Sequence, residues 1–220
     1  MKTLLFVLGG VTIGDKPDKH FLLRTEAAIN YYKQHSDSEE ISFLVSGRWT
    51  NVTDAFELTE AEIGKRYILN ELPDAQVVKE DISVELIGNY AFSKPLIQAL
   101  EPSKVVIFSA EFMLNRNQTV ARKIFANDIP YEHIVITHDW SDNAALVNKE
   151  LLAAKLFDNL SSDIEDGDDS AIRDKLLYAT PYYFKGIIKD KDFFDTYWEG
   201  GFDQYLGALE VRNKINNTSV

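Results

Sequence analysis

Five short apolar runs alternate along the chain with longer segments of helical period. The runs cover residues 3–10, 41–47, 75–80, 104–109 and 133–138 and are rich in Val, Ile and Phe. They are apolar almost throughout rather than at every second position, which is typical of strands buried on both faces of a parallel sheet. Strands that alternate with helices in this way predict right-handed crossovers. The expected fold class is therefore α/β, a Rossmann-like parallel sheet of about five strands flanked by helices.

The segments between the runs carry apolar residues at helical spacing. Leu23 and Ala27 lie on one side of the helix expected after the first strand. The helix expected over residues 59–72 begins with Thr59 and carries Glu62 three positions later. This pair predicts a capping box, in which each side chain accepts the other residue's backbone N–H. Two more helices are expected over residues 116–128 and 143–157.

The pattern changes after Phe157. Residues 161–170, SSDIEDGDDS, are acidic and nearly free of apolar side chains, which is typical of a solvated linker. The residues beyond it are helical in period and dense in aromatic side chains. We therefore divide the chain into a Rossmann-like domain (1–158), an acidic linker (159–170) and an aromatic-rich C-terminal helical lobe (171–220). The lobe is expected to pack on the first domain, with a lid over the site or a homodimer contact as alternatives.

Charge and composition narrow the possible partners. The chain has a net charge of −12, which argues against nucleic acid because a run of phosphates would not be neutralised. It has no cysteine, so disulfides and thiolate metal sites are excluded, and its four histidines lack metal-ligand spacing. No metal is expected. The opening lacks a signal-peptide cleavage site, and no run approaches the ~18 apolar residues that span a bilayer. We expect a cytoplasmic bacterial protein without a membrane partner.

Polar residues and glycines follow each expected strand. Ligands of open parallel sheets bind beyond the carboxyl ends of the strands, where these residues would meet. The candidates are Gly9 and Gly10 after the first strand, Ser46 and Gly47 after the second, Glu80, Asp81, Ser83 and Asn89 after the third, and Ser109 and Arg116 after the fourth. Taken alone, each residue has a simpler explanation: Asn89 could cap the N-terminus of a helix, and Arg116 could be an ordinary surface charge. Together these residues predict one polar cleft for a small-molecule ligand.

The same stretches resemble the YdcF-like family, a Rossmann-like family of unassigned function related to the envelope-linked SanA and ElyC proteins. The resemblance covers about residues 3–155 and is carried by VLGG (7–10), Arg24 with Ala28 and the tyrosines 31–32, LVSG (44–47), TEA (59–61), KEDIS (79–83), Asn89 and Arg116. It implies a ligand-binding set of Gly9, Gly10, Arg24, Ser46, Gly47, Glu60, Glu80, Ser83, Asn89 and Arg116. Leu86 and Gly88 replace a threonine and a glutamate of the family pattern, and Met113 replaces the histidine of a His-x-x-Arg motif.

Two functions stay open at this point. In the first, the protein binds an anionic or nucleotide-type metabolite as a transferase-like enzyme, with Arg24 and Arg116 pairing with the anion and Glu60 or Glu80 orienting a hydroxyl or acting as a base. The resemblance implies S-adenosylmethionine as one such ligand, and no cofactor is otherwise indicated. In the second, the protein is a non-catalytic metabolite-binding or sensing module with an envelope-related role, which the missing histidine favours.

Overall fold

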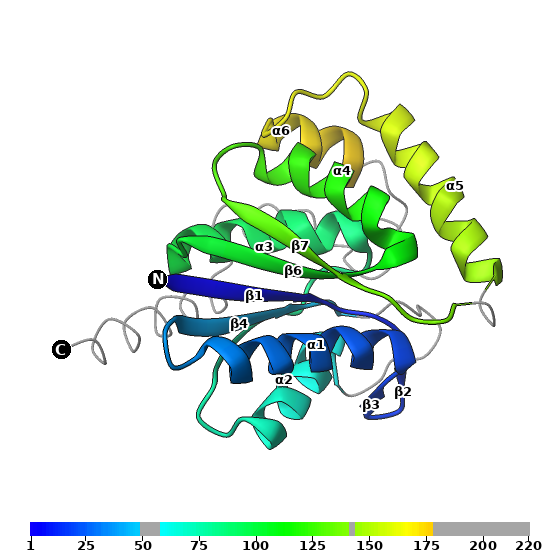
Figure 1. The fold of residues 1–220 in the computed structure, drawn as a ribbon. Coiled ribbons are helices and arrows are strands. Elements are labelled where there is room, and N and C mark those ends of the chain that lie inside the picture. Colours follow the sequence, from blue (N-terminus) through cyan, green and yellow to red (C-terminus); the bar gives the residue numbers. More distant parts are fainter. Residues whose placement is uncertain (49–57, 141–143, 178–220) are drawn as a thin grey trace.

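The computed structural model describes residues 1–48, 58–140 and 144–177, and these form a parallel sheet between two layers of helices (Figure 1). The five strands lie in the order β5-β4-β1-β6-β7, and every neighbouring pair is parallel. Their bounds are β1 Lys2–Leu8, β4 Glu40–Ser46, β5 Gln76–Glu80, β6 Lys104–Ala110 and β7 Tyr131–Ile136. The structure thus confirms the predicted α/β, Rossmann-like fold class.

Two helices cover each face of the sheet (Figure 1). On one face lie α1 (Lys19–His35) and α2 (Glu60–Glu71), and on the other lie α3 (Leu86–Leu100) and α4 (Leu114–Phe125). The remaining helical segments are the 3-10 turn η1 (Glu111–Met113), α5 (Ala144–Leu160), α6 (Asp169–Ala171) and a π-helical turn over Ile172–Leu177. Helix α5 packs on α4 and η1, outside the layer that α3 and α4 form.

The strands are buried on both faces, as their continuous apolar sequence predicts. In β1, Leu4, Phe6 and Leu8 face the core beneath α3 and α4, whereas Leu5 and Val7 face the core beneath α1 and α2. These side chains are at most 1% exposed. A strand that is apolar on both faces suits the centre of a parallel sheet, where helices cover both faces.

Three local features differ from the sequence-based expectation. A small hairpin of β2 (Thr12–Ile13) and β3 (Lys16–Pro17) follows β1, with Gly14 at φ +63° in its turn. Strand β7 begins two residues earlier than predicted and ends at Ile136, so His133 lies inside the strand rather than at its start. The start of α4 at Leu114 likewise precedes the predicted start at residue 116.

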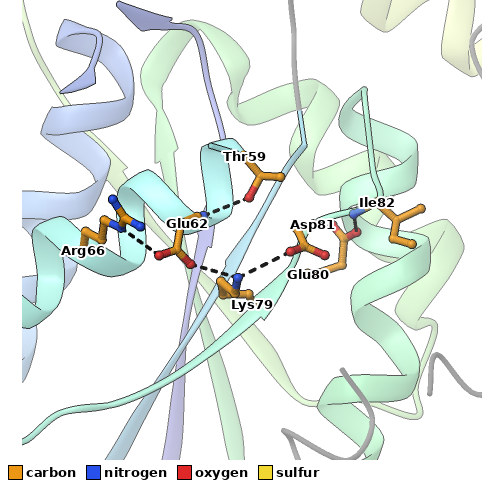
Figure 2. Close-up of polar contacts among 7 residues, drawn as sticks. All are labelled: Thr59, Glu62, Arg66, Lys79, Glu80, Asp81 and Ile82. Carbon is orange, nitrogen blue, oxygen red and sulfur yellow. Dashed lines mark hydrogen bonds and ion pairs between the residues drawn. The ribbon is translucent and has the colours of Figure 1, made fainter. Parts of the chain in front are cut away.

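The predicted capping box at the start of α2 is half formed (Figure 2). Thr59 accepts a hydrogen bond from the backbone N–H of Glu62 at 3.1 Å. The Glu62 carboxylate does not accept the backbone N–H of Thr59, which a full capping box would require. It binds Arg66 on its own helix and Lys79 on β5, both at 2.8 Å. In these two bonds both partners are charged, whereas a bond from the backbone N–H of Thr59 would involve only one charge.

The acidic segment 159–170 is mostly exposed but is held to the domain at several points. Ser161 and Ile164 are 1% and 3% exposed, and Ile164 belongs to the core beneath α3 and α4. Lys123 on α4 donates to the Ile164 carbonyl oxygen at 2.5 Å, and the Gly167 N–H donates to the Lys123 carbonyl oxygen at 2.7 Å. The predicted C-terminal lobe lies outside the described residues from position 178 onward, so the division into domains stays a prediction.

Among the described residues, no helix combines the length and the apolar character that a membrane crossing requires.

Candidate functional site

The strand order places a topological switch point between β1 and β6. The chain leaves the carboxyl end of β1 for α1 on one face of the sheet, and it leaves the carboxyl end of β6 through η1 for α4 on the other face. The two connections therefore diverge above the carboxyl ends of β1 and β6. Ligands of open α/β sheets bind in the crevice that such a divergence creates. The predicted site residues after these strands are consequently the first to consider.

Gly9 and Gly47 bring the ends of β1 and β4 into close contact around Glu60. A Cβ atom at Gly9 would lie 2.3 Å from the Ser46 carbonyl oxygen and 2.5 Å from Glu60 Oε2. A Cβ atom at Gly47 would lie 2.5 Å from the same Glu60 oxygen, and the φ of +129° at Gly47 disfavours any other residue. Glu60 itself is only 4% exposed. Both glycines are required by the packing of the protein on itself, before any ligand is considered.

Arg24 is a buried cation at the end of β1. It is 3% exposed, and it donates from Nε to the Leu8 carbonyl oxygen at 3.1 Å and from Nη2 to the Gly9 carbonyl oxygen at 2.8 Å. A Cβ atom at Gly10 would lie 2.5 Å from Nη2, so the glycine makes room for the guanidinium. Burial lowers the pKa of Arg24, partly offset by Asp18 and Glu60. The guanidinium nevertheless stays charged, since arginine is not deprotonated in proteins.

The charge of Arg24 has no ion-pair partner within the part of the chain that the structure describes. No carboxylate there lies within 4.0 Å of its nitrogens, and Nη1 makes no hydrogen bond. Buried charges are normally paired because removing them from water is costly. The two carbonyl oxygens satisfy part of the guanidinium, and Asp18, Glu60 and Glu150 stabilise its charge without a direct ion pair.

The polar segment after β5 is largely closed on itself. Glu80 is fully buried, and its Oε1 accepts hydrogen bonds from the backbone N–H groups of Ile82 at 2.7 Å and Ser83 at 2.8 Å. The Ser83 hydroxyl bonds both to Glu80 Oε2 and to Asn89 Oδ1. Burial raises the pKa of Glu80 to about 7, against the bonds from Ser83 and Ile82 that lower it.

The bonds around the Ser83 hydroxyl fit a protonated Glu80, whose pKa is raised by burial. A serine hydroxyl has one proton and cannot donate to two oxygens at once. With a proton on Glu80 Oε2, the chain of bonds runs from Glu80 to Ser83 and from Ser83 to Asn89, and every group is satisfied. Glu80 therefore serves to hold the loop between β5 and α3.

The start of α3 corrects the suggested capping role of Asn89. The N-cap is Glu85, whose carboxylate accepts from the N–H groups of Ile87 at 2.7 Å and Gly88 at 2.6 Å. Asp18 caps α1 in the same way, through the N–H of Phe21. A carboxylate thus occupies the position that an anionic ligand would take at the N-termini of α1 and α3.

Asp81 lies on the outer side of the loop, apart from Glu80. Its carboxylate is 3.5 Å from Lys79 Nζ, which also binds Glu62 (Figure 2). These three residues and Arg66 form a chain of alternating charges along α2 and β5. At this exposure each surface pair contributes little to stability.

On the other side of the switch point, Ser109 and Arg116 both have protein partners. Ser109 is fully buried, and its hydroxyl accepts from Asn117 Nδ2 at 2.9 Å and lies 3.1 Å from His133 Nδ1. Burial lowers the pKa of His133 to about 4, so this imidazole is neutral at neutral pH. Arg116 binds Glu150 on α5 at 2.9 Å and is 17% exposed, so it is an interhelical ion pair rather than a plain surface charge.

A cluster of aromatic rings that the sequence analysis did not identify lies beside Arg24. We call His20, Phe112, His138 and Trp140 the aromatic cluster. His20 stacks on Trp140 with ring centroids 4.8 Å apart and planes at 12°. Phe112 and His138 meet the Trp140 ring edge-on at 5.0 and 5.1 Å. The four residues come from α1, η1 and the segment after β7, and only the strand order brings them together.

The predicted residues fall into separate groups. Gly9, Gly10, Arg24, Gly47 and Glu60 surround the ends of β1 and β4, together with the buried Ser46, whose carbonyl oxygen faces Gly9. Glu80, Ser83 and Asn89 form a second group, while Asp81, Ser109 and Arg116 each contact other residues. Whether any of them binds a ligand stays a prediction. Comparisons of the chain with family models, curated proteins and solved structures found no match.

Proposed function

We propose that this protein binds a small anionic metabolite of nucleotide type at the carboxyl edge of the sheet, between the ends of β1 and β6. The buried Arg24 carries the proposal. This guanidinium is 3% exposed, its only hydrogen bonds within the described structure go to two carbonyl oxygens, and no carboxylate described there forms a direct ion pair with it. An anionic ligand group would supply a direct ion pair through Nη1.

The binding-module function is favoured over the transferase-like one. Glu80 and Ser109 are fully buried and engaged with other protein groups, so neither is placed to act on a ligand. Met113, where the YdcF-like pattern has a histidine, has no acid–base chemistry. Membership of the YdcF-like family, an envelope-related role and S-adenosylmethionine as the ligand belong to the same proposal and rest on the sequence residues alone.

A ligand screen with matched arginine variants tests the proposal. The purified protein is screened by thermal shift against nucleotides, adenosyl compounds, sugar nucleotides and phosphorylated metabolites, because a ligand of the native state raises Tm by mass action. Dissociation constants of the hits are then measured by calorimetry for Arg24→Gln, Arg24→Lys and Arg122→Gln. Arg122 is the control, since it lies in the last turn of α4 in an exposed ion pair with Asp166.

We expect Arg24→Gln to weaken binding at least about tenfold, which is the usual effect of losing a charge-assisted hydrogen bond. Arg24→Lys should bind with intermediate affinity because it keeps the charge but loses the planar fork. Arg122→Gln should bind as the wild type does. Equal affinity of all variants that remain folded in unliganded melts would refute the proposed site. If the wild type converts the bound ligand to a product, the protein is the transferase-like enzyme rather than the binding module.

A further inference from the structure

Two ring nitrogens in the aromatic cluster are buried without a partner. His20 Nδ1 and Trp140 Nε1 have no hydrogen bond within the described residues. Trp140 is 9% exposed, so its N–H is withdrawn from water. A buried tryptophan N–H normally finds an acceptor, because leaving it without one is costly. A ligand with polar atoms at the carboxyl edge of the sheet would supply the missing acceptor next to an aromatic surface.

The cluster has the composition of a stacking site. His20 and Phe112 are half-buried and His138 is exposed, so ring surface remains accessible next to the buried Trp140. Burial, assisted by the charge of Arg24, lowers the pKa of His20 although Asp18 opposes it. A neutral imidazole stacks on Trp140 and offers a nitrogen at its edge. Heteroaromatic bases stack on such surfaces, since each has a π-face and polar edges.

The distance between the cluster and Arg24 is set by α1. His20 and Arg24 are four residues apart, so they lie on the same side of the helix, about 6 Å apart along its axis. One side chain stacks with Trp140, and the other reaches the turn after β1. A ring and an anion joined by a ribose would span this separation. Sugar phosphates and simple carboxylic acids would leave the cluster unused.

We propose that the aromatic cluster is the base-binding half of the site and that the ligand is a nucleoside carrying an anionic group. The heteroaromatic base stacks on the cluster and accepts a hydrogen bond from Trp140 Nε1, while the anionic group faces Arg24. This inference rests on the proposed function, since Arg24 defines where the anion lies. It adds that the base is required for affinity.

The test compares ligands with and without a base. Binding of AMP, GMP, CMP, UMP, adenosine and ribose 5-phosphate to the full chain is measured by calorimetry, for the wild type, His20→Ala, Trp140→Phe and the control His35→Ala. His35 also stacks on an aromatic ring in α1, because its ring centroid lies 4.1 Å from that of Tyr31. It lies at the opposite end of the helix from His20. His20→Ala and His35→Ala therefore remove the same ring from the same helix.

We expect at least one of the four nucleotides to bind between about 5-fold and 150-fold more tightly than ribose 5-phosphate, the range that stacking of one base provides. His20→Ala should remove most of this preference and leave ribose 5-phosphate binding unchanged. Trp140→Phe should weaken nucleotide binding less, because it keeps the ring and loses the N–H. His35→Ala should leave both affinities unchanged.

The outcomes separate the two proposals. Ribose 5-phosphate binding as tightly as every nucleotide would overturn the base-binding inference and leave the anion site intact. A preference for nucleotides that His20→Ala and His35→Ala change equally would also overturn it. Adenosine binding without any preference for a phosphate would support the base-binding half and refute the proposed anion site. If none of the six compounds binds, both proposals fail.

Discussion

Below about pH 7, burial holds the carboxyl group of Glu80 in its protonated form. Its side chain is fully buried, its Oε1 accepts two backbone N–H groups, and its Oε2 shares the Ser83 hydroxyl. The two N–H groups favour the charged form, but burial outweighs them and raises the pKa to about 7. The stability of the protein must therefore depend on the protonation of this residue.

The pH dependence of unfolding should show this effect. The unfolded chain loses the Glu80 proton near the ordinary pKa of 4.5, whereas the native state keeps it up to about pH 7. Between these values the native state binds more protons, so the free energy of unfolding falls as pH rises, by about 3 kcal/mol in total. Glu80→Gln mimics the protonated acid, because its amide oxygen accepts the two N–H groups and its NH₂ donates to Ser83.

We expect Glu80→Gln to match the wild type near pH 4, below the unfolded pKa, and to be the more stable protein at pH 8. Urea unfolding at several pH values measures the difference, in which the titration of all other groups cancels. A difference that stays constant from pH 4 to pH 8 would contradict the buried, protonated acid.

At the scale of elements, Gly64 shows packing overriding helix propensity. It lies inside α2, where glycine costs about 1 kcal/mol relative to alanine. A Cβ atom at this position would lie 2.7 Å from Phe21 Cζ and 2.8 Å from Val45 Cγ1. Both neighbours are fully buried, so neither has space to move. The glycine lets α2 approach α1 and β4 closely.

Gly64→Ala should consequently destabilise the protein despite the better helix former. Overpacking a tight core costs about 1–3 kcal/mol, and subtracting the propensity gain leaves a net loss of about 1 kcal/mol. Asn70→Ala, at an exposed position of the same helix, should instead gain a few tenths of a kcal/mol. Chemical denaturation of the two variants measures both values. A stabilised Gly64→Ala would show that α2 does not pack this closely.

The elements could be predicted from the sequence, whereas most contacts between them could not. The strands were predictable because β1, β4 and β6 are apolar on both faces, and Thr59 was recognisable as an N-cap from its position alone. The partner of Glu62 could not be predicted, because Lys79 lies on a strand that only the fold brings alongside α2. The aromatic cluster was missed for the same reason, since the adjacency of β1, β6 and β7 in the sheet places its members together.

At the scale of the whole molecule, the acidic segment is part of the packed structure. Its charges are exposed, but Ile164 enters the core and Lys123 and Gly167 bind the segment to the end of α4. Acidic composition alone predicted a solvated linker. One isoleucine among nine polar or small residues carried too little hydrophobic pattern to indicate this attachment.

Ile164→Ala should lower the stability of the whole domain by about 2–4 kcal/mol, the usual cost of truncating a buried isoleucine. Glu165→Ala, at the exposed neighbouring position, should change it by less than about 0.5 kcal/mol. Limited proteolysis gives a second measurement, since cleavage within residues 161–170 should be slow in the wild type and fast in Ile164→Ala. Rapid cleavage of the wild type would mean that the segment is a free linker.

The central place of β1 in the sheet has a consequence for the order of assembly. Lys2 pairs with Glu40, but the other edge of the strand pairs with β6, where Thr3 lies opposite Lys104. At ribosomal rates of about 5–20 residues per second, the roughly 60 residues between these two partners take about 3 to 13 s to be made. Throughout that interval β1 has one open edge and an uncovered apolar face. A nascent chain of this fold therefore exposes its most apolar strand for seconds, which is the time available to a chaperone.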